Sequence, residues 1–315
     1  MPKSPEVEFA HPDISRWREG NTGVPYVMSF EAARPGPHVM INAVTHGNEI
    51  CGAIAVAMLL ERGIRPTHGK LTFAFVNYMA YTQFDPAHPR ATRCVEEDIN
   101  RVWVEAILDG PGSSVELKRA RELRAIYDTV DLLLDLHSMS SASPALMLCA
   151  GLDKERAFAQ RMGYPELVVC GSGHVRGRRL IEYTPFNDAA NAKVAVLVEC
   201  GSHWEKPTDQ VAIDAAVHFL EAAGTVAAAD LAGLAAQPRQ KVKLLEVSYG
   251  HTAKTDAFRF VADYPGGHEF GAAGTVFAHD GEEPVATPHE RAVLIMPNYR
   301  PRRGDRCLRL ARWVA

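Results

Sequence analysis

The sequence has no hydrophobic run long enough to suggest a membrane protein. A membrane-spanning helix needs roughly 18 apolar residues, and no stretch of the 315 residues reaches that length. The N-terminal sequence Met-Pro-Lys-Ser-Pro-Glu lacks the apolar core of a secretory signal. A formal net charge of −4 argues against a general nucleic-acid-binding protein, because such proteins normally carry a net positive charge. We therefore expect a soluble, cytoplasmic protein with neither a membrane nor a nucleic acid as its partner.

The six cysteines also lack a recognisable pattern. No two of them form a C-x-x-C pair, which excludes a zinc ribbon built from cysteines. Scattered cysteines are typical of reduced thiols in a cytoplasm. The rest of the composition is that of an ordinary globular protein, with 47% hydrophobic and 23% charged residues. The chain therefore has enough apolar material for a large core.

Continuous apolar runs alternate with helical patterns over most of the chain. Long apolar runs predict buried strands at residues 39–44, 71–77, 131–137 and 194–199, with shorter ones at 24–30, 145–149 and 167–170. Amphipathic or alanine-rich patterns predict helices at residues 48–62, 114–129, 154–162 and 208–236, the last one broken near Gly224. This alternation predicts an α/β fold, with a mixed, mostly parallel sheet covered by helices on both faces.

A second, smaller unit is predicted at the C-terminal end. Gln237-Pro238 marks the boundary, and alternating patterns with turn signals follow from residue 241 onward. We therefore expect a main α/β domain over residues 1–237 and a small C-terminal β domain over residues 238–315.

Three of the predicted strands end at residues that bind metals or transfer protons. His46 follows the first strand closely, His137 ends the third and Glu199 ends the fourth. Functional groups of open α/β sheets gather beyond the carboxyl ends of the strands, whereas packing alone does not favour such residues there. Glu49 lies three residues after His46, so that both side chains can point at one spot. Taken alone, this H-x-x-E pair is equally typical of a solvated helix start.

Together these residues predict a hydrolytic zinc site. His46, Glu49 and His137 can bind one Zn²⁺ ion and leave a fourth position open for water, as catalytic zinc requires. Zinc lowers the pKa of this water to roughly 7, and Glu199 is the candidate base that takes its proton. Asp135 lies on the same strand face as His137, and it either orients an imidazole or caps a neighbouring loop.

The charged segment at residues 96–103 has two interpretations. It is either a solvated loop held by surface ion pairs, or a clamp in which guanidinium groups bind a carboxylate and stabilise a developing oxyanion. The candidate residues for such a clamp are Arg93, Asn100 and Arg101.

Four motifs, in this order, resemble those of one known family. They are His46-Gly47-Asn48-Glu49, Asp98-Ile99-Asn100-Arg101, Asp135-Leu136-His137 and Val198-Glu199. The motifs span residues 38–205 and are similar to those of the succinylglutamate desuccinylase/aspartoacylase family, which is related to the zinc carboxypeptidases. The resemblance implies a zinc-carboxypeptidase-like catalytic domain followed by a small β domain. It also implies zinc binding by His46, Glu49 and His137.

The same resemblance implies roles for the residues around the metal. Glu199 would be the general base, and Arg93 corresponds to the arginine that polarises the substrate carbonyl. Asn100 and Arg101 would hold the substrate carboxylate. The implied reaction is the hydrolysis of a small N-acyl amino acid, or of a related carboxylate or ester, to the free amino acid and a carboxylate.

The chain departs from the family pattern in its substrate-binding residues. Ala189 stands where aspartoacylase-like members carry a further arginine, so dicarboxylic substrates do not follow from the resemblance. Arg178 and Arg179, farther upstream, are candidates for that role, although a solvated position explains them equally well. Tyr299 is the candidate counterpart of a late tyrosine in the family.

Two other functions are compatible with the sequence. One is a zinc carboxypeptidase that cleaves a C-terminal peptide bond, and the other is a metal-dependent binding module without activity. Glu199 argues against the binding module, because a protein that only binds needs no general base. Assembly into a homo-oligomer is an open alternative to a monomer.

Overall fold

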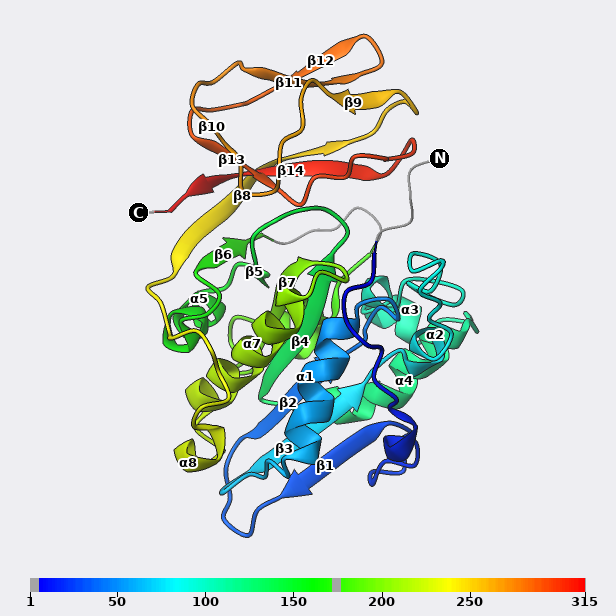
Figure 1. The fold of residues 1–315 in the computed structure, drawn as a ribbon, viewed down its shortest axis with the longest axis vertical. Helices are drawn as coiled ribbons and strands as arrows, with labels where there is room; N and C mark the ends of the chain where they lie inside the picture. Colours follow the sequence, from blue (N-terminus) through cyan, green and yellow to red (C-terminus); the bar gives the residue numbers. More distant parts are fainter. Residues whose placement is uncertain (1–5, 172–176, 315) are drawn as a thin grey trace.

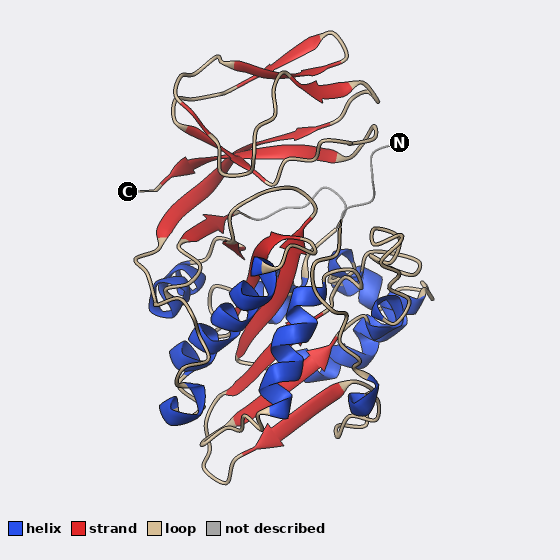
Figure 2. Ribbon diagram, viewed as in Figure 1, coloured by secondary structure: helices blue, strands red, loops and turns tan. Residues whose placement is uncertain are grey.

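A computed structural model describes residues 6–171 and 177–314 of the chain, and a large mixed sheet runs through it (Figure 1). Within the described residues the sheet has eleven strands, in the order β1-β3-β2-β4-β7-β5-β6-β8-β14-β13-β10. A second sheet has the order β12-β11-β9. Helices flank the strands of the large sheet (Figure 2). The predicted α/β fold is therefore confirmed.

The strands have the following bounds: β1 Val27–Glu31, β2 His38–Ala43, β3 Lys70–Phe75, β4 Leu132–Met139, β5 Leu146–Cys149, β6 Leu167–Cys170, β7 Val194–Ser202, β8 Lys243–Thr252, β9 Phe258–Phe260, β10 Glu269–Phe270, β11 Val276–Asp280, β12 Glu283–Ala286, β13 Ala292–Ile295 and β14 Arg306–Trp313. The α-helices are α1 Ile50–Glu61, α2 Tyr78–Tyr81, α3 Glu105–Leu108, α4 Val115–Tyr127, α5 Asp153–Met162, α6 Thr184–Asn187, α7 Pro207–Ala223 and α8 Ala228–Leu231. Three short 3₁₀ turns are η1 Ser15–Trp17, η2 Ile99–Arg101 and η3 Leu180–Glu182.

The centre of the sheet is parallel. β3, β2, β4 and β7 are neighbours that run in the same direction, whereas β1, β5 and the strands after β8 join through antiparallel pairs. Every residue of β2 is buried, because helices cover both of its faces. Val39 and Ile41 pack in the core cluster that contains α1, α5 and α7. Met40 packs on the other side, in the cluster that contains α4.

Local signals explain where the main helices begin and end. Ser114 caps α4, because its Oγ accepts a hydrogen bond of 3.0 Å from the backbone N–H of Leu117. α1 ends just before Gly63, which has a φ of 68°. α7 ends at Gly224, which has a φ of 72° and the left-handed conformation that favours glycine. The predicted helix break is therefore present, and only the short helix α8 follows it.

The large sheet continues past the predicted boundary at residues 237 and 238. β8 pairs in parallel with β6, from Leu167 opposite Lys243 to Cys170 opposite Glu246. β14, β13 and β10 then extend the sheet, and β9, β11 and β12 form the small sheet beside it (Figure 1). The C-terminal strands are thus joined to the rest of the protein by main-chain hydrogen bonds.

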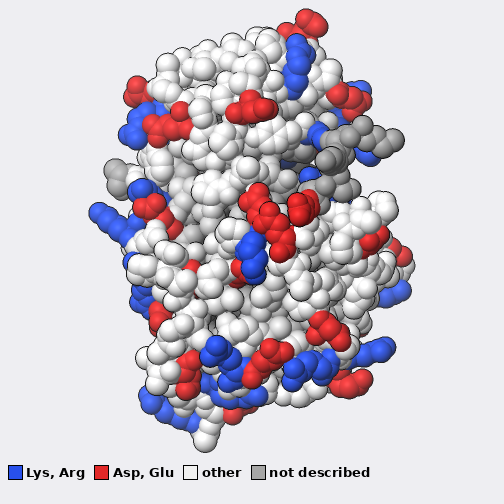
Figure 3. Space-filling model, in the orientation of Figure 1, with Lys and Arg blue, Asp and Glu red and all other residues white. Residues whose placement is uncertain are grey.

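One face of the molecule carries both signs of charge among many uncharged residues (Figure 3). Acidic and basic side chains are interspersed on the face shown in Figure 3. Among the described residues, no helix combines the length and the apolar character that a membrane crossing requires.

Candidate metal centre and active-site pocket

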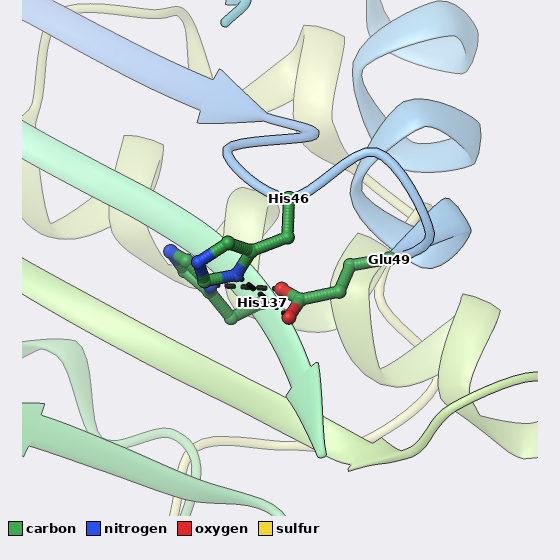
Figure 4. Close-up of side chains that lie close together, drawn as sticks. All are labelled: His46, Glu49 and His137. Carbon is green, nitrogen blue, oxygen red and sulfur yellow. Dashed lines mark hydrogen bonds and ion pairs between the residues drawn. The ribbon is translucent and has the colours of Figure 1, made fainter. Parts of the chain in front are cut away.

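The turn after β2 carries the first two predicted metal ligands. Val44 has a φ of 52°, which is unusual for a β-branched residue and directs the chain away from the strand. The following residues place His46 and Glu49 on the loop before α1 (Figure 4). His137 lies in β4, which pairs with β2 in parallel. The three side chains therefore meet beyond the carboxyl end of β2, as the strand pattern predicts.

The three side chains point at one another inside the protein. Glu49 lies between the two imidazoles, with its Oε1 2.8 Å from His46 Nδ1 and its Oε2 2.8 Å from His137 Nδ1 (Figure 4). One ligand atom from each residue lies within 4.8 Å of the others. The exposed fractions are 3% for His46 and 1% for each of the other two. Such a buried group of donors can hold a metal ion.

A carboxylate lies next to the Nε2 atom of each imidazole, on the side of the ring that faces away from Glu49. Asp98 Oδ1 lies 2.9 Å from His46 Nε2, and Asp135 Oδ2 lies 2.9 Å from His137 Nε2. Thr45 donates a hydrogen bond of 2.7 Å to the other oxygen of Asp135. Asp135 thus contacts an imidazole, which is compatible with the orienting role, one of the two that the sequence left open. A carboxylate behind the histidine is typical of metal sites, because it sets the direction of the ring and strengthens the ligand.

The carboxylates and imidazoles of this cluster stabilise each other's charged forms, so zinc binding must displace a proton from the imidazoles. Burial disfavours charge on both residues, yet the two imidazoles hold the pKa of Glu49 well below its ordinary value. The carboxylates of Asp135 and Glu49 likewise outweigh burial and hold the pKa of His137 well above 6.5. Two imidazoles and one carboxylate are also the donor set of many catalytic zinc sites. The residues therefore fit a zinc ion.

Glu199 lies beside this cluster on the neighbouring strand. It is directly opposite His137 in the parallel pairing of β7 with β4, which explains why two distant strand ends come together. The side chain is buried, and its Oε2 has no hydrogen-bond partner in the described part of the chain. Burial raises the pKa of Glu199 to about 8. In the metal-free protein this carboxyl group therefore carries a proton at neutral pH, and a cation bound nearby would lower its pKa and free it to accept one.

The predicted clamp residues line the same pocket. Arg93, which is 40% exposed, donates a hydrogen bond of 3.2 Å to Glu49 and another to Asp98. Asn100 accepts a hydrogen bond of 2.7 Å from the backbone N–H of Leu180. Arg101 lies next to Asn100 in η2, which is capped by the Asp98 side chain. The segment is therefore ordered against the metal cluster and is more than a solvated loop.

Two other predicted substrate residues lie elsewhere. Arg178 is exposed, and only its neighbour Arg179 lines the pocket. Tyr299 is 41% exposed and donates a hydrogen bond to the backbone carbonyl of Tyr264. Ala189 is exposed and is also absent from the pocket wall. The structure therefore brings Arg179 into the pocket in place of Arg178 and Tyr299.

The pocket has a volume of about 390 Å³, and further residues complete its wall. His203 lies in its wall, 2.6 Å from the Ser138 hydroxyl, and burial lowers the pKa of His203 to about 4. Asn298, Arg306 and Arg309 enter from the C-terminal strands and the loop before β14. No sequence motif marks these three residues, because their position depends on how the sheet continues past β8.

Comparisons with known proteins agree with this architecture. A family model described as the succinylglutamate desuccinylase/aspartoacylase catalytic domain matches residues 35–221. The fold is similar to that of succinylglutamate desuccinylase from Vibrio parahaemolyticus, with a TM-score of 0.66 and 18% identity over 92% of this chain and 87% of that one. A search of curated proteins gave no significant match.

Two further solved structures have the same fold. A succinylglutamate desuccinylase/aspartoacylase from Rhodobacter sphaeroides has a TM-score of 0.63 and 19% identity over 92% of this chain and 89% of that one. The product-bound ectoine utilization protein EutE (DoeB) from Ruegeria pomeroyi has a TM-score of 0.63 and 18% identity over 90% and 87% of the two chains. The family match covers more than half of the chain, including the metal cluster and Glu199, and the protein therefore belongs to the succinylglutamate desuccinylase/aspartoacylase family.

Proposed function

We propose that this protein is a zinc-dependent hydrolase that removes the acyl group from a small N-acyl amino acid or a related carboxylate. Membership of the family supports an acyl-amino-acid deacylase. The observation that carries the finer proposal is the position of Glu199. Its carboxyl group, with a free oxygen, lies in the same pocket as the donor cluster of His46, Glu49 and His137.

In this proposal, His46, Glu49 and His137 hold the zinc ion. When bound, zinc supplies a Lewis acid and lowers the pKa of a water molecule to roughly 7. Glu199 accepts the proton of the attacking water and later passes it to the leaving amine. A nearby cation lowers the pKa of a buried carboxyl group, so a larger fraction of Glu199 would be ionised and able to accept a proton at neutral pH once zinc is bound.

The arginines and Asn100 position the substrate. Arg93 is partly exposed and lies 3.2 Å from Glu49, which places its guanidinium close enough to the metal ligands to polarise a carbonyl oxygen. Arg101 and Asn100 lie together in the pocket wall and bind the substrate carboxylate. A charged clamp of this kind selects a free carboxylate near the bond that breaks.

The shape of the pocket favours a small substrate over a peptide. The C-terminal part of the chain completes the pocket wall with Asn298, Arg306 and Arg309. These residues are far from the candidate metal ligands in the sequence. A pocket of about 390 Å³ has room for an acyl amino acid. We therefore place the carboxypeptidase alternative second.

Hydrolysis of N-acetyl, N-formyl and N-succinyl amino acids by the zinc-loaded protein tests the proposal. We expect release of a free amino acid, and a kcat reduced by at least 10²-fold in Glu199→Gln with the zinc content unchanged. His46→Ala should lose both zinc and activity. The exposed residues Glu205 and His88 provide the matched controls Glu205→Gln and His88→Ala, which should behave as the wild type. Full activity of Glu199→Gln, or peptide cleavage in place of deacylation, would contradict the proposal.

A further inference from the structure

Arginines dominate the charge of the active-site pocket. Its charged wall residues are two glutamates, Glu49 and Glu199, and six arginines, which are Arg90, Arg93, Arg101, Arg179, Arg306 and Arg309. Several of these arginines already have acidic partners. Arg93 and Arg101 share Asp98, and Arg179 donates a hydrogen bond of 3.0 Å to Glu182. The arginines that enter from β14 are different, and Figure 1 shows this strand in red above β4 and β7.

A bulge in β14 brings Arg306 and Arg309 to the same side of the strand. Side chains alternate along a regular strand, so residues three positions apart would point to opposite faces. Between Arg306 and Leu308, however, the register of β14 against β8 shifts by one residue. Cys307 is the extra residue, and it returns both arginines to the pocket face. Bulges next to active sites commonly redirect a side chain in this way.

Among the described residues, neither guanidinium group is joined to a carboxylate by a hydrogen bond or an ion pair. Arg306 Nε is buried without a hydrogen bond. Gly250 on β8 leaves space for this side chain, because a Cβ at that position would lie 2.1 Å from Arg306 Nη1. The nearest acidic influence on Arg309 among the described residues is Glu182, which is already paired with Arg179. Both arginines are half-buried, and a charged donor that is removed from water without a partner is costly unless a ligand supplies the acceptor.

Neighbouring arginines crowd this part of the pocket. Burial, followed by repulsion from Arg179, Arg306 and Arg101, lowers the pKa of Arg309 to about 10. Arg309 therefore still carries a positive charge at neutral pH. An anion placed among these arginines would relieve the repulsion and satisfy the free N–H groups at the same time.

We propose that Arg306 and Arg309, supported by Arg179, form a second anion-binding subsite of the pocket. This subsite recognises a carboxylate or phosphate group of the substrate that is distinct from the carboxylate held by Asn100 and Arg101. The inference rests on the proposed deacylase function and narrows its substrates to those with at least two anionic groups. The C-terminal strands therefore set the substrate specificity, while the segment matched by the family model supplies the metal ligands and the base.

Binding of small anions to the full-length, zinc-loaded protein tests the subsite by calorimetry. Succinate and butyrate have the same number of carbon atoms but carry two charges and one. We expect succinate to bind 10- to 100-fold more tightly than butyrate in the wild type. Arg306→Met and Arg309→Met should each weaken succinate binding about tenfold and leave butyrate binding unchanged. The rank of 3-phosphonopropionate against succinate shows whether the subsite prefers a phosphate-like group or a carboxylate.

Arg312 provides a matched control, because it is an exposed arginine on the same strand that does not line the pocket. Arg312→Met should bind every anion as the wild type does, and Arg309→Lys should retain part of the preference for succinate. If Arg309→Met does not fold, the salt dependence of the wild type provides the test. Its preference for succinate over butyrate must weaken with rising salt, because salt screens the attraction between charges. Equal binding of succinate and butyrate, or an equal loss of both in the methionine variants, would overturn the subsite.

These outcomes are separate from those that test the deacylase function. A preference for succinate without hydrolysis of any acyl amino acid would support the subsite and contradict the proposed function. Hydrolysis of an acyl amino acid without a preference for succinate over butyrate would support the proposed function and contradict the subsite.

Discussion

Asp98 and Asp135 each contact one imidazole of the candidate metal site. Each carboxylate lies 2.9 Å from the Nε2 atom of one histidine, on the side opposite the Nδ1 atom that faces Glu49. Such contacts set the orientation of a ligand and increase its basicity. The two aspartates are therefore positioning residues and not ligands.

Replacing either aspartate by asparagine should weaken zinc binding without unfolding the protein. We expect the affinity for zinc to fall about 10- to 100-fold in Asp98→Asn and Asp135→Asn. Competition with a chelator of known affinity measures this change, and thermal unfolding reports on the fold. Asp109→Asn is a matched control. Asp109 is exposed and forms an ion pair with Arg124, and neither residue belongs to the candidate metal cluster. Unchanged zinc affinity in both variants would show that the carboxylates do not support the ligands.

His38 links the stability of the protein to pH. Its ring is 7% exposed, and its two nitrogens lie 3.0 Å from the Thr129 hydroxyl and 2.8 Å from the Thr72 hydroxyl. The Thr129 hydroxyl donates to the Ile126 carbonyl, so it accepts from His38 and the neutral ring is satisfied. Burial lowers the pKa of His38 from 6.5 to about 4 in the folded state.

The unfolded chain therefore binds a proton at His38 between pH 6.5 and 4, whereas the folded protein does not. Stability from this residue is complete above pH 6.5 and is lost as the pH falls toward 4, by up to about 3 kcal/mol. Urea unfolding at pH 7 and pH 5 should show a smaller pH dependence in His38→Gln than in the wild type. The exposed His88 serves as the control, and His88→Gln should retain the pH dependence of the wild type. If the free energy of unfolding changed equally between pH 7 and pH 5 in all three proteins, His38 would not be the source of the pH dependence.

At the scale of elements, the turn between β2 and α1 connects the metal ligands to the loop that carries Arg93. The Gly47 N–H donates a hydrogen bond of 3.0 Å to the Arg93 carbonyl. A Cβ at Gly47 would lie 2.4 Å from the carbonyl carbon of Ala80 and 2.5 Å from the Thr92 oxygen. Both contacts are with backbone atoms, which cannot move aside alone. The turn can therefore hold only glycine at this position.

Gly47→Ala should separate the turn from the Arg93 loop. We expect a loss of stability of about 1–3 kcal/mol, as for other overpacked sites, together with weaker zinc binding. Thermal unfolding and zinc titration measure the two effects. Gly63→Ala is a useful comparison, because Gly63 has open space around its Cβ position but a positive φ. It should reduce stability and leave zinc affinity unchanged, and equal zinc affinity in both variants would contradict the role of Gly47.

At the scale of the whole molecule, the C-terminal strands complete both the sheet and the pocket. β8 covers the edge of β6, and β14 contributes two arginines to the cavity wall. A chain that ends at residue 237 would expose the unpaired edge of β6, and such edges promote aggregation. We therefore propose that the predicted domain of residues 238–315 is a part of the catalytic unit.

Truncation after residue 237 should yield a protein that aggregates or unfolds without cooperativity. Light scattering and thermal unfolding of the shortened chain against the full-length protein measure this effect. A monomeric product that unfolds cooperatively at the original temperature would show that the two predicted domains are independent.

The sequence by itself determined the α/β class, the family and the donor cluster, because these depend on local patterns. Buried parallel strands are mostly apolar, and His137 and Glu199 lie in the C-terminal halves of β4 and β7, which continue to Met139 and Ser202. The motif at residues 46–49 brings two ligands together within a single turn. Such short-range relations can be read along the chain without knowledge of the rest of the fold.

Only the tertiary structure decided which distant residues share the pocket. The continuation of the sheet from β6 to β8 and the bulge at Cys307 bring Arg306 and Arg309 beside Arg179, whereas Arg178 and Tyr299 lie outside the pocket wall. A bulge inverts the alternation of every side chain beyond it, and strand pairing between remote segments leaves no local signature in the sequence. The metal cluster was therefore predictable from the chain, but the residues proposed to bind the substrate were predictable only in part.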